Sequence, residues 1–163
     1  MKRAYLLLQD GTEFMGKAFG GEAPRPAELA ELVGATRCVG EVVFNTAMSG
    51  YAEVLTDPSY TGQLVAMTYP HIGNYGIDAE WSEIAPEVGV DRPKVKAAGF
   101  IVRALYTGSV PAGRMTLHDY LLAHGIPGIS DIDTRALTLH LRDRGAQNGL
   151  ILAPDKGEEL SPE

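Results

Sequence analysis

The order of short apolar runs along this 163-residue chain limits its fold more than any other feature of the sequence. Residues 4–8 and 13–19 are predicted to be two strands, and they flank the pair Asp10-Gly11. Such a pair is typical of a tight hairpin turn because both residues tolerate the positive φ angles that the turn requires. Gly99 lies inside a later strand-like run, where we expect another part of the chain to approach closely. Further strand-like runs are at 39–47, 63–69, 95–103, 126–130 and 150–153.

Helical patterns lie between and after these strands. Thr116 and Asp133 are expected to cap two helices, each followed by a glycine that ends it. In the second helix, Leu137 and Leu141 fall on one face and predict that this face is buried. Strands come first along the chain and then alternate with helices. This order predicts an α/β domain whose sheets have antiparallel and parallel parts. Shorter helical stretches are expected at 27–33, within a surface insertion over 22–36, and at 51–55.

Charge and cysteine content exclude several classes of function. Lys and Arg total 14 against 21 Asp and Glu, so the net charge is -7, and such a chain lacks the positive surface that binds nucleic acid or an anionic membrane. One cysteine, Cys38, forms no internal disulfide, which favours a reducing compartment. The apolar run at 4–8 is shorter than a secretory signal or a membrane span. The sequence therefore predicts a soluble, cytoplasmic domain.

No nucleophile with its activating base can be assembled from the sequence. Cys38 precedes a strand rather than a helix N-terminus, which predicts a small buried residue instead of a reactive thiol. Ser49 lacks the glycine two positions before it that a hydrolase elbow requires, so a turn role is favoured. A small hydrolase that uses Ser49 and His71 is a remote alternative, because no acidic residue is placed to orient the histidine. A structural hydrogen bond is the favoured role of His71, which opens a glycine-rich loop at 72–76.

Metal binding and carboxylate catalysis are likewise not favoured. His118, His124 and His140 lie in or beside the two late helices, without the spacing to a carboxylate that metal sites show. Asp131 and Asp133 form a close pair of carboxylates, but they lie at a strand-to-helix junction, where helix capping is favoured over catalysis.

The segment at 56–60, with the sequence TDPSY, is the one most suggestive of a binding site. Asp57 is pushed towards an extended backbone by the proline after it, and Pro58 fixes its own φ angle. Ser59 therefore follows a rigid stem, and its hydroxyl can both donate and accept hydrogen bonds, which suits the polar groups of an amino acid. A simple Asp-Pro turn is the alternative, and spacing alone favours that turn.

Several ordered stretches resemble one family. They are DGTEF at 10–14, GEVVFNTAMSGY at 40–51, EVLTDPSY at 53–60, TYPHIGNYG at 68–76, ISDIDTRALT at 129–138 and RGAQNG at 144–149. Together they look like the N-terminal domain of the small subunit of glutamine-dependent carbamoyl-phosphate synthetase. The resemblance runs from the first hairpin to about Ala153.

The resemblance implies a fold and a domain order. The family's N-terminal domain has a layered β/β/α fold of the swivelling type, with mixed parallel and antiparallel sheets, and we expect it over residues 1–153. Residues 154–163 are then expected to begin a linker to a class I glutamine amidotransferase domain that is absent here. That domain carries the Cys-His-Glu set with which the family hydrolyses glutamine.

The resemblance also implies partners and one site residue. Ammonia from glutamine passes to a large subunit, which uses ATP and magnesium to make carbamoyl phosphate for arginine and pyrimidine biosynthesis. No cofactor, metal or catalytic residue is expected in this chain. Ser59 matches the serine of the family's Asp-Pro-Ser-Tyr motif, which contacts glutamine from this domain.

Two departures from the family shape the expected role. Residues 20–37 form a longer stretch than the family usually has there, and Cys38 does not match the family's nucleophile. We therefore expect this chain alone to lack glutaminase activity, and to dock the glutaminase onto the large subunit of a heterodimer while Ser59 completes the glutamine site. The alternative is a purely structural assembly module with no ligand contact.

Overall fold

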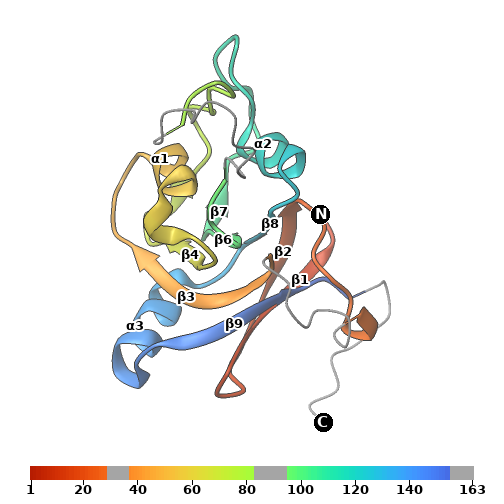
Figure 1. Cartoon of the computed structure of the whole chain (residues 1–163), viewed down its shortest axis with the longest axis vertical. Helices are drawn as coiled ribbons and strands as arrows, with labels where there is room; N and C mark the ends of the chain where they lie inside the picture. Colours follow the sequence, from red (N-terminus) through yellow and green to blue (C-terminus); the bar gives the residue numbers. More distant parts are fainter. Residues whose placement is uncertain (29–36, 83–94, 155–163) are drawn as a thin grey trace.

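A closed barrel dominates the computed structural model, which describes residues 1–28, 37–82 and 95–154. Among these residues the barrel strands follow the order β1-β2-β8-β6-β4-β3-β9, and β5 and β7 form a separate two-stranded sheet (Figure 1). In chain order the elements are β1 (Arg3–Leu8), β2 (Glu13–Gly20), β3 (Val39–Asn45), α1 (Tyr51–Thr56), the 3₁₀ turn η2 (Pro58–Tyr60), β4 (Leu64–Met67), β5 (His71–Ile72), β6 (Gly99–Ile101), β7 (Ala104–Leu105), α2 (Leu117–Ala123), β8 (Pro127–Ser130), α3 (Thr134–Arg144) and β9 (Gln147–Leu152).

The predicted hairpin begins the barrel. Strands β1 and β2 pair antiparallel, with Leu7 opposite Glu13 and Arg3 opposite Lys17. Gly11 has a φ angle of 86° in the turn, as an Asp-Gly pair predicts. The hairpin prediction is confirmed.

Parallel and antiparallel pairings both occur, which confirms the predicted mixed α/β class. Strands β3, β4, β6 and β8 are joined by parallel pairings, whereas β1, β2 and β9 join their neighbours antiparallel. The barrel closes because β9 pairs with both β1 and β3. This closure was not predicted from the sequence, since it joins strands from the two ends of the chain.

Two apolar cores lie on opposite sides of the barrel wall. Leu64 and Ala66 of β4 belong to the core inside the barrel, and Val65 and Met67 of the same strand belong to an outer core, as alternation along a strand requires. Leu137 and Leu141 of α3 join the inner core. Helix α3 thereby covers one end of the barrel, while α1 and α2 belong to the outer layer (Figure 1).

Several boundaries differ from those predicted. The strand expected at 95–103 is limited to β6 (Gly99–Ile101), and the last strand begins at Gln147 rather than at 150. The predicted close approach at Gly99 is confirmed, because an added Cβ would lie 2.7 Å from Leu64 Cδ2 and 2.8 Å from Ile151 Cδ1. The helix expected at 27–33 lies largely outside the described residues. No helix in the described ranges has the length and apolar character needed to span a membrane.

Candidate functional site

The segment from residue 45 to residue 60, which we call the serine segment, leaves the barrel at the end of β3 and returns next to its own start. Asn45 Nδ2 donates to the hydroxyl of Tyr60 at 2.9 Å, so the two ends of the segment are tied together. Asn45 Oδ1 also accepts from the Ala47 N–H at 2.7 Å, which fixes the bend after β3. Between these ties the segment holds α1 and η2.

Ser59 lies on the rigid stem that the sequence predicts. Asp57 is extended, with φ -70° and ψ 125°, and Pro58 opens η2. The Asp57 carboxylate accepts from the Ser59 N–H at 2.8 Å, and Thr61 Oγ1 donates to the Pro58 carbonyl at 2.7 Å. Ser59 is exposed. The turn is therefore tightly held, and its serine is accessible from outside the domain.

The start of α1 is held by a residue that sequence reasoning did not single out. Gly50 precedes α1 with a φ angle of 85° and has no side chain to cap the helix. The hydroxyl oxygen of Tyr75 instead accepts from the N–H of Gly50 at 2.6 Å and from the N–H of Tyr51 at 3.2 Å. The rings of Tyr51 and Tyr75 stack at a centroid distance of 4.3 Å. Burial, and then the neighbouring Tyr75, raise the pKa of Tyr51, so the Tyr51 phenol stays a neutral hydrogen-bonding group.

Cys38, Ser49 and His71 do not form a reactive set. Cys38 is buried and has a φ angle of 63°, and desolvation raises the pKa of its thiol. A raised pKa disfavours the thiolate, which is the nucleophilic form, so the prediction of a buried structural cysteine is confirmed. Ser49 is exposed in the bend before α1, and His71 is exposed in β5.

The side chains of two late histidines, His118 and His140, connect separate elements. His118 Nδ1 accepts from the Gly20 N–H at 2.9 Å, which joins α2 to the end of β2. His140 Nε2 lies 2.8 Å from Asp10 Oδ2, which joins α3 to the β1–β2 turn. These contacts support the packing role that was favoured for both residues.

The carboxylate pair at 131 and 133 divides into two structural roles. Asp133 caps α3, and its side chain accepts from the Ala136 N–H at 3.0 Å. Asp131 does not cap the helix; it has a φ angle of 63° and its carboxylate lies 2.8 Å from Lys17 Nζ. The capping prediction is thus confirmed for Asp133 and wrong for Asp131. Within the described ranges, no three His, Cys, Asp or Glu side chains are grouped so that they could hold a metal ion.

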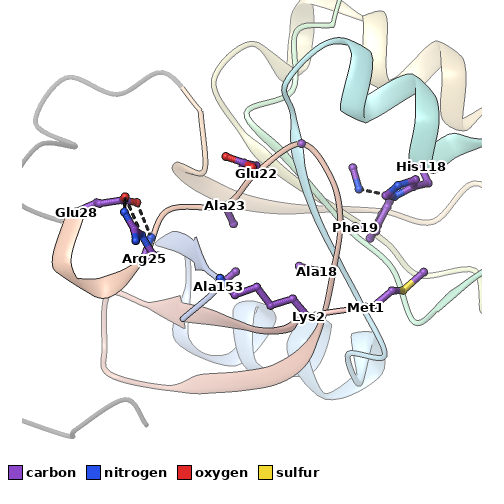
Figure 2. Close-up of a pocket in the computed structure, with 12 residues that line it drawn as sticks. Met1, Lys2, Ala18, Phe19, Glu22, Ala23, Arg25, Glu28, His118 and Ala153 are labelled. Atoms are coloured by element: carbon purple, nitrogen blue, oxygen red, sulfur yellow. Dashed lines mark hydrogen bonds and ion pairs between the residues drawn. The ribbon is translucent and has the colours of Figure 1, made fainter. Parts of the chain in front are cut away.

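A cavity of about 520 Å³ is lined by residues outside the serine segment. Figure 2 shows its lining: Met1 and Lys2 before β1, the end of β2 and the residues after it, His118 of α2, and Ala153 after β9. Charges of both signs surround it, because Lys2 and Arg25 face the same space as Glu22 and Glu28. Arg25 Nε donates to Glu28 Oε1 at 2.8 Å, as the dashed lines in Figure 2 show. This cavity was not predicted from the sequence, since its walls come from distant segments.

Comparison with known proteins identifies the family. Residues 6–151 match the model of the carbamoyl-phosphate synthase small chain, CPSase domain. The carbamoyl phosphate synthase small chain of Solidesulfovibrio magneticus is 48% identical over 150 residues, which are 91% of this chain and 34% of that protein. The protein of the same name from Photorhabdus laumondii is 47% identical over 94% of this chain and 34% of its own length. The one from Methanopyrus kandleri is 43% identical over 99% of this chain and 39% of its own length.

The chain thus spans roughly a third of the length of the curated relatives it matches, with 34% and 39% as the covered shares. Among solved structures, a peptidase M28 precursor from Shewanella amazonensis aligns over 94% of this chain and 35% of its own, with 11% identity and a TM-score of 0.46. That likeness is too weak to support a conclusion about fold or activity.

Proposed function

The chain belongs to the carbamoyl-phosphate synthase small-chain family as its CPSase domain, and we propose that it docks a glutaminase onto the large subunit and completes the glutamine site. In this proposal glutamine is hydrolysed in a class I amidotransferase domain with a Cys-His-Glu set. The large subunit, with ATP and magnesium, then uses the ammonia to make carbamoyl phosphate for arginine and pyrimidine biosynthesis. The heterodimer would work in the cytoplasm, and the domain would have the swivelling β/β/α layering of its family.

The geometry of Ser59 carries the proposal of a glutamine contact. Its backbone is fixed by Asp57, and its side chain is exposed at the end of the tied serine segment. A hydroxyl on a fixed stem loses little conformational entropy when it binds, so one hydrogen bond from it contributes usefully to affinity. Glutamine offers matching donors and acceptors in its ammonium, carboxylate and amide groups.

The surroundings of Cys38, Ser49 and His71 support the proposal that this domain alone has no glutaminase activity. The described residues hold one cysteine thiol, that of Cys38, and it is buried with a raised pKa. No hydrogen bond among the described residues joins Ser49 to His71, so the alternative of a small hydrolase finds no support. The proposed glutaminase chemistry therefore depends on groups outside this chain.

Exposed apolar side chains beside the serine segment support a docking role. Phe44 is 41% exposed, Met48 is 75% exposed and Tyr69 is 38% exposed. Phe44 and Met48 lie on either side of Asn45, and Tyr69 follows Thr68, whose N–H donates to the Asn45 carbonyl at 3.0 Å. Exposed apolar patches mark surfaces that other proteins cover, and in this proposal each of the three side chains contributes to the docking surface.

Ser59→Ala tests the glutamine contact in a small subunit that contains both this domain and the amidotransferase domain, assembled with its large subunit. We expect the KM for glutamine to rise roughly fivefold, since one hydrogen bond contributes about 1 kcal/mol. The value of kcat and the co-elution of the subunits in size-exclusion chromatography should stay unchanged. Ser49→Ala is the matched control, because it removes an exposed hydroxyl from the same segment and should leave the KM as it is.

The purely structural alternative makes the opposite prediction for the same variant. If the domain only assembles the complex, Ser59→Ala is silent in every kinetic constant. A fivefold rise of the KM for glutamine in the Ser49→Ala control would also contradict the proposal, because the effect would then belong to the whole serine segment rather than to Ser59.

A further inference from the structure

We propose that Tyr75 is a positioning residue for Ser59, because its hydroxyl holds the start of α1 and thereby fixes where the Ser59 turn lies. The inference rests on the proposed glutamine contact of Ser59. It adds a residue from a different loop, which reaches the serine segment across 25 positions of sequence.

Helix α1 has an unusual cap. The first N–H groups of any helix lack partners inside the helix, and a Ser, Thr, Asp or Asn just before the helix usually accepts from them. Gly50 occupies that position here and offers no side-chain acceptor. The hydroxyl oxygen of Tyr75 accepts from Gly50 N at 2.6 Å and Tyr51 N at 3.2 Å, and so replaces the missing cap.

Tyr75 is itself firmly held. Its ring stacks on Tyr51 at 4.3 Å with an interplanar angle of 23°. Arg114 Nη1 donates to the Tyr75 carbonyl at 3.1 Å, and the Tyr51 hydroxyl donates to the Gly76 carbonyl at 3.3 Å. The hydroxyl of Tyr75 therefore acts as a fixed point, to which the start of α1 is attached.

A short series of hydrogen bonds connects Gly50 to Ser59. The Val54 N–H donates to the Gly50 carbonyl at 3.0 Å, and the Asp57 N–H donates to the Glu53 carbonyl at 2.9 Å. Asp57 then accepts from the Ser59 N–H at 2.8 Å. Because α1 has six residues, it is too short to be stable without outside contacts, and a shift at its start is transmitted to the turn after it.

The test is Tyr75→Phe, which removes the hydroxyl and keeps the stacked ring. In the assembled two-domain subunit we expect the KM for glutamine to rise roughly threefold to tenfold with kcat unchanged. In hydrogen exchange we expect the amides of Gly50, Tyr51 and Ser59 to exchange about tenfold faster. Amides of the barrel strands should keep their rates.

Tyr106→Phe is the matched control. The Tyr106 hydroxyl donates to the Ser109 carbonyl at 3.3 Å in an exposed loop, so this variant also deletes one phenol hydrogen bond. It should leave both the KM and the exchange of Ser59 unchanged.

The outcomes separate this inference from the proposed function. If Ser59→Ala raises the KM and Tyr75→Phe changes neither the KM nor the Ser59 amide, packing alone places α1 and the inference is wrong, while the proposed function stands. If Ser59→Ala is silent, the glutamine contact is wrong, and exchange at the Ser59 amide decides the positioning step by itself. A uniform rise in exchange over the barrel would also overturn the inference, because it would mean a general loss of stability.

Discussion

Replacing Leu137 with alanine tests whether α3 closes the end of the barrel. The side chain of Leu137 is 0% exposed and belongs to the core inside the barrel. Truncation of a buried leucine costs about 2–5 kcal/mol, since transfer free energy is lost and a cavity remains. We expect about 3 kcal/mol for Leu137→Ala, because the surrounding β strands are closed into a barrel and collapse poorly into the space.

Leu139 supplies the matched control on the same helix. Its side chain is 37% exposed, two positions away from Leu137. Leu139→Ala removes the same atoms from the same helix but opens no internal cavity, and alanine has the higher helix propensity. Its effect on the free energy of unfolding should stay within about 0.5 kcal/mol.

Urea unfolding followed by circular dichroism measures both variants. With an m value of about 2 kcal/mol/M, the midpoint of Leu137→Ala should fall by about 1.5 M. Its Tm should fall by about 6–12 °C. If Leu137→Ala and Leu139→Ala shift the midpoint equally, α3 does not close the barrel in the way described.

Two further predictions concern helix and turn electrostatics. Asp133→Ala should lower the free energy of unfolding by about 1 kcal/mol in urea titrations, because it removes the cap of α3. Asp133→Asn keeps a capping oxygen and should lower it much less. Equal losses of stability in the two variants would contradict a capping role. The pKa of Asp10 is lowered, first because the Thr12 backbone N–H donates to its carboxylate. The ionised Asp10 carboxylate therefore stabilises the folded state above the unfolded pKa of about 3.9. This stabilisation is lost as the pH falls through the lower pKa of the folded state. The stability advantage of the wild type over Asp10→Asn should therefore shrink when unfolding is measured at decreasing pH below about 4, and an advantage that grows there would refute this assignment.

Local signals in the sequence predict those parts of the fold that local chemistry decides. The Asp10-Gly11 turn, and the caps by Thr116 and Asp133, are found where they were expected. Each depends on a backbone group and a side chain within a few residues of each other, so sequence spacing specifies the contact.

Contacts between distant segments could not be predicted in the same way. The closure of the barrel joins β9 to β1 and β3, and no pattern within β9 names those partners. Asp131 was assigned to helix capping because it lies near α3, yet it pairs with Lys17 on β2. A carboxylate near the start of a helix fits the capping pattern in the sequence. Only the three-dimensional arrangement shows that the ammonium group of Lys17 lies next to Asp131.

In the candidate site, too, local contacts were predicted and a contact between distant segments was missed. The stem of Ser59 was predicted from Asp57 and Pro58, because a residue before proline is extended and proline fixes its own φ angle. The hydrogen bond from the Ser59 N–H to the Asp57 carboxylate was not predicted. The attachment of α1 to Tyr75 was missed, since glycine at position 50 signals a turn and gives no indication that a tyrosine 25 residues later caps the helix. A helix start with no capping residue of its own was the one available sign that an outside acceptor was needed.

The separation of the two cores has a consequence for how variants of this domain are interpreted. The serine segment packs through Tyr51 and Leu55 into the outer core, whereas Leu137 and Leu64 belong to the inner core. A cavity inside the barrel lowers the stability of the whole domain, but it does not touch the contacts that hold α1 and η2 in the folded state. A substitution in the Tyr51–Tyr75 stack changes those contacts directly, and it disturbs fewer residues of the barrel than a cavity in its interior does. If the proposed glutamine contact holds, loss of glutamine affinity at unchanged stability points to the outer layer, whereas a cavity in the barrel interior lowers stability and leaves the affinity of the folded domain unchanged.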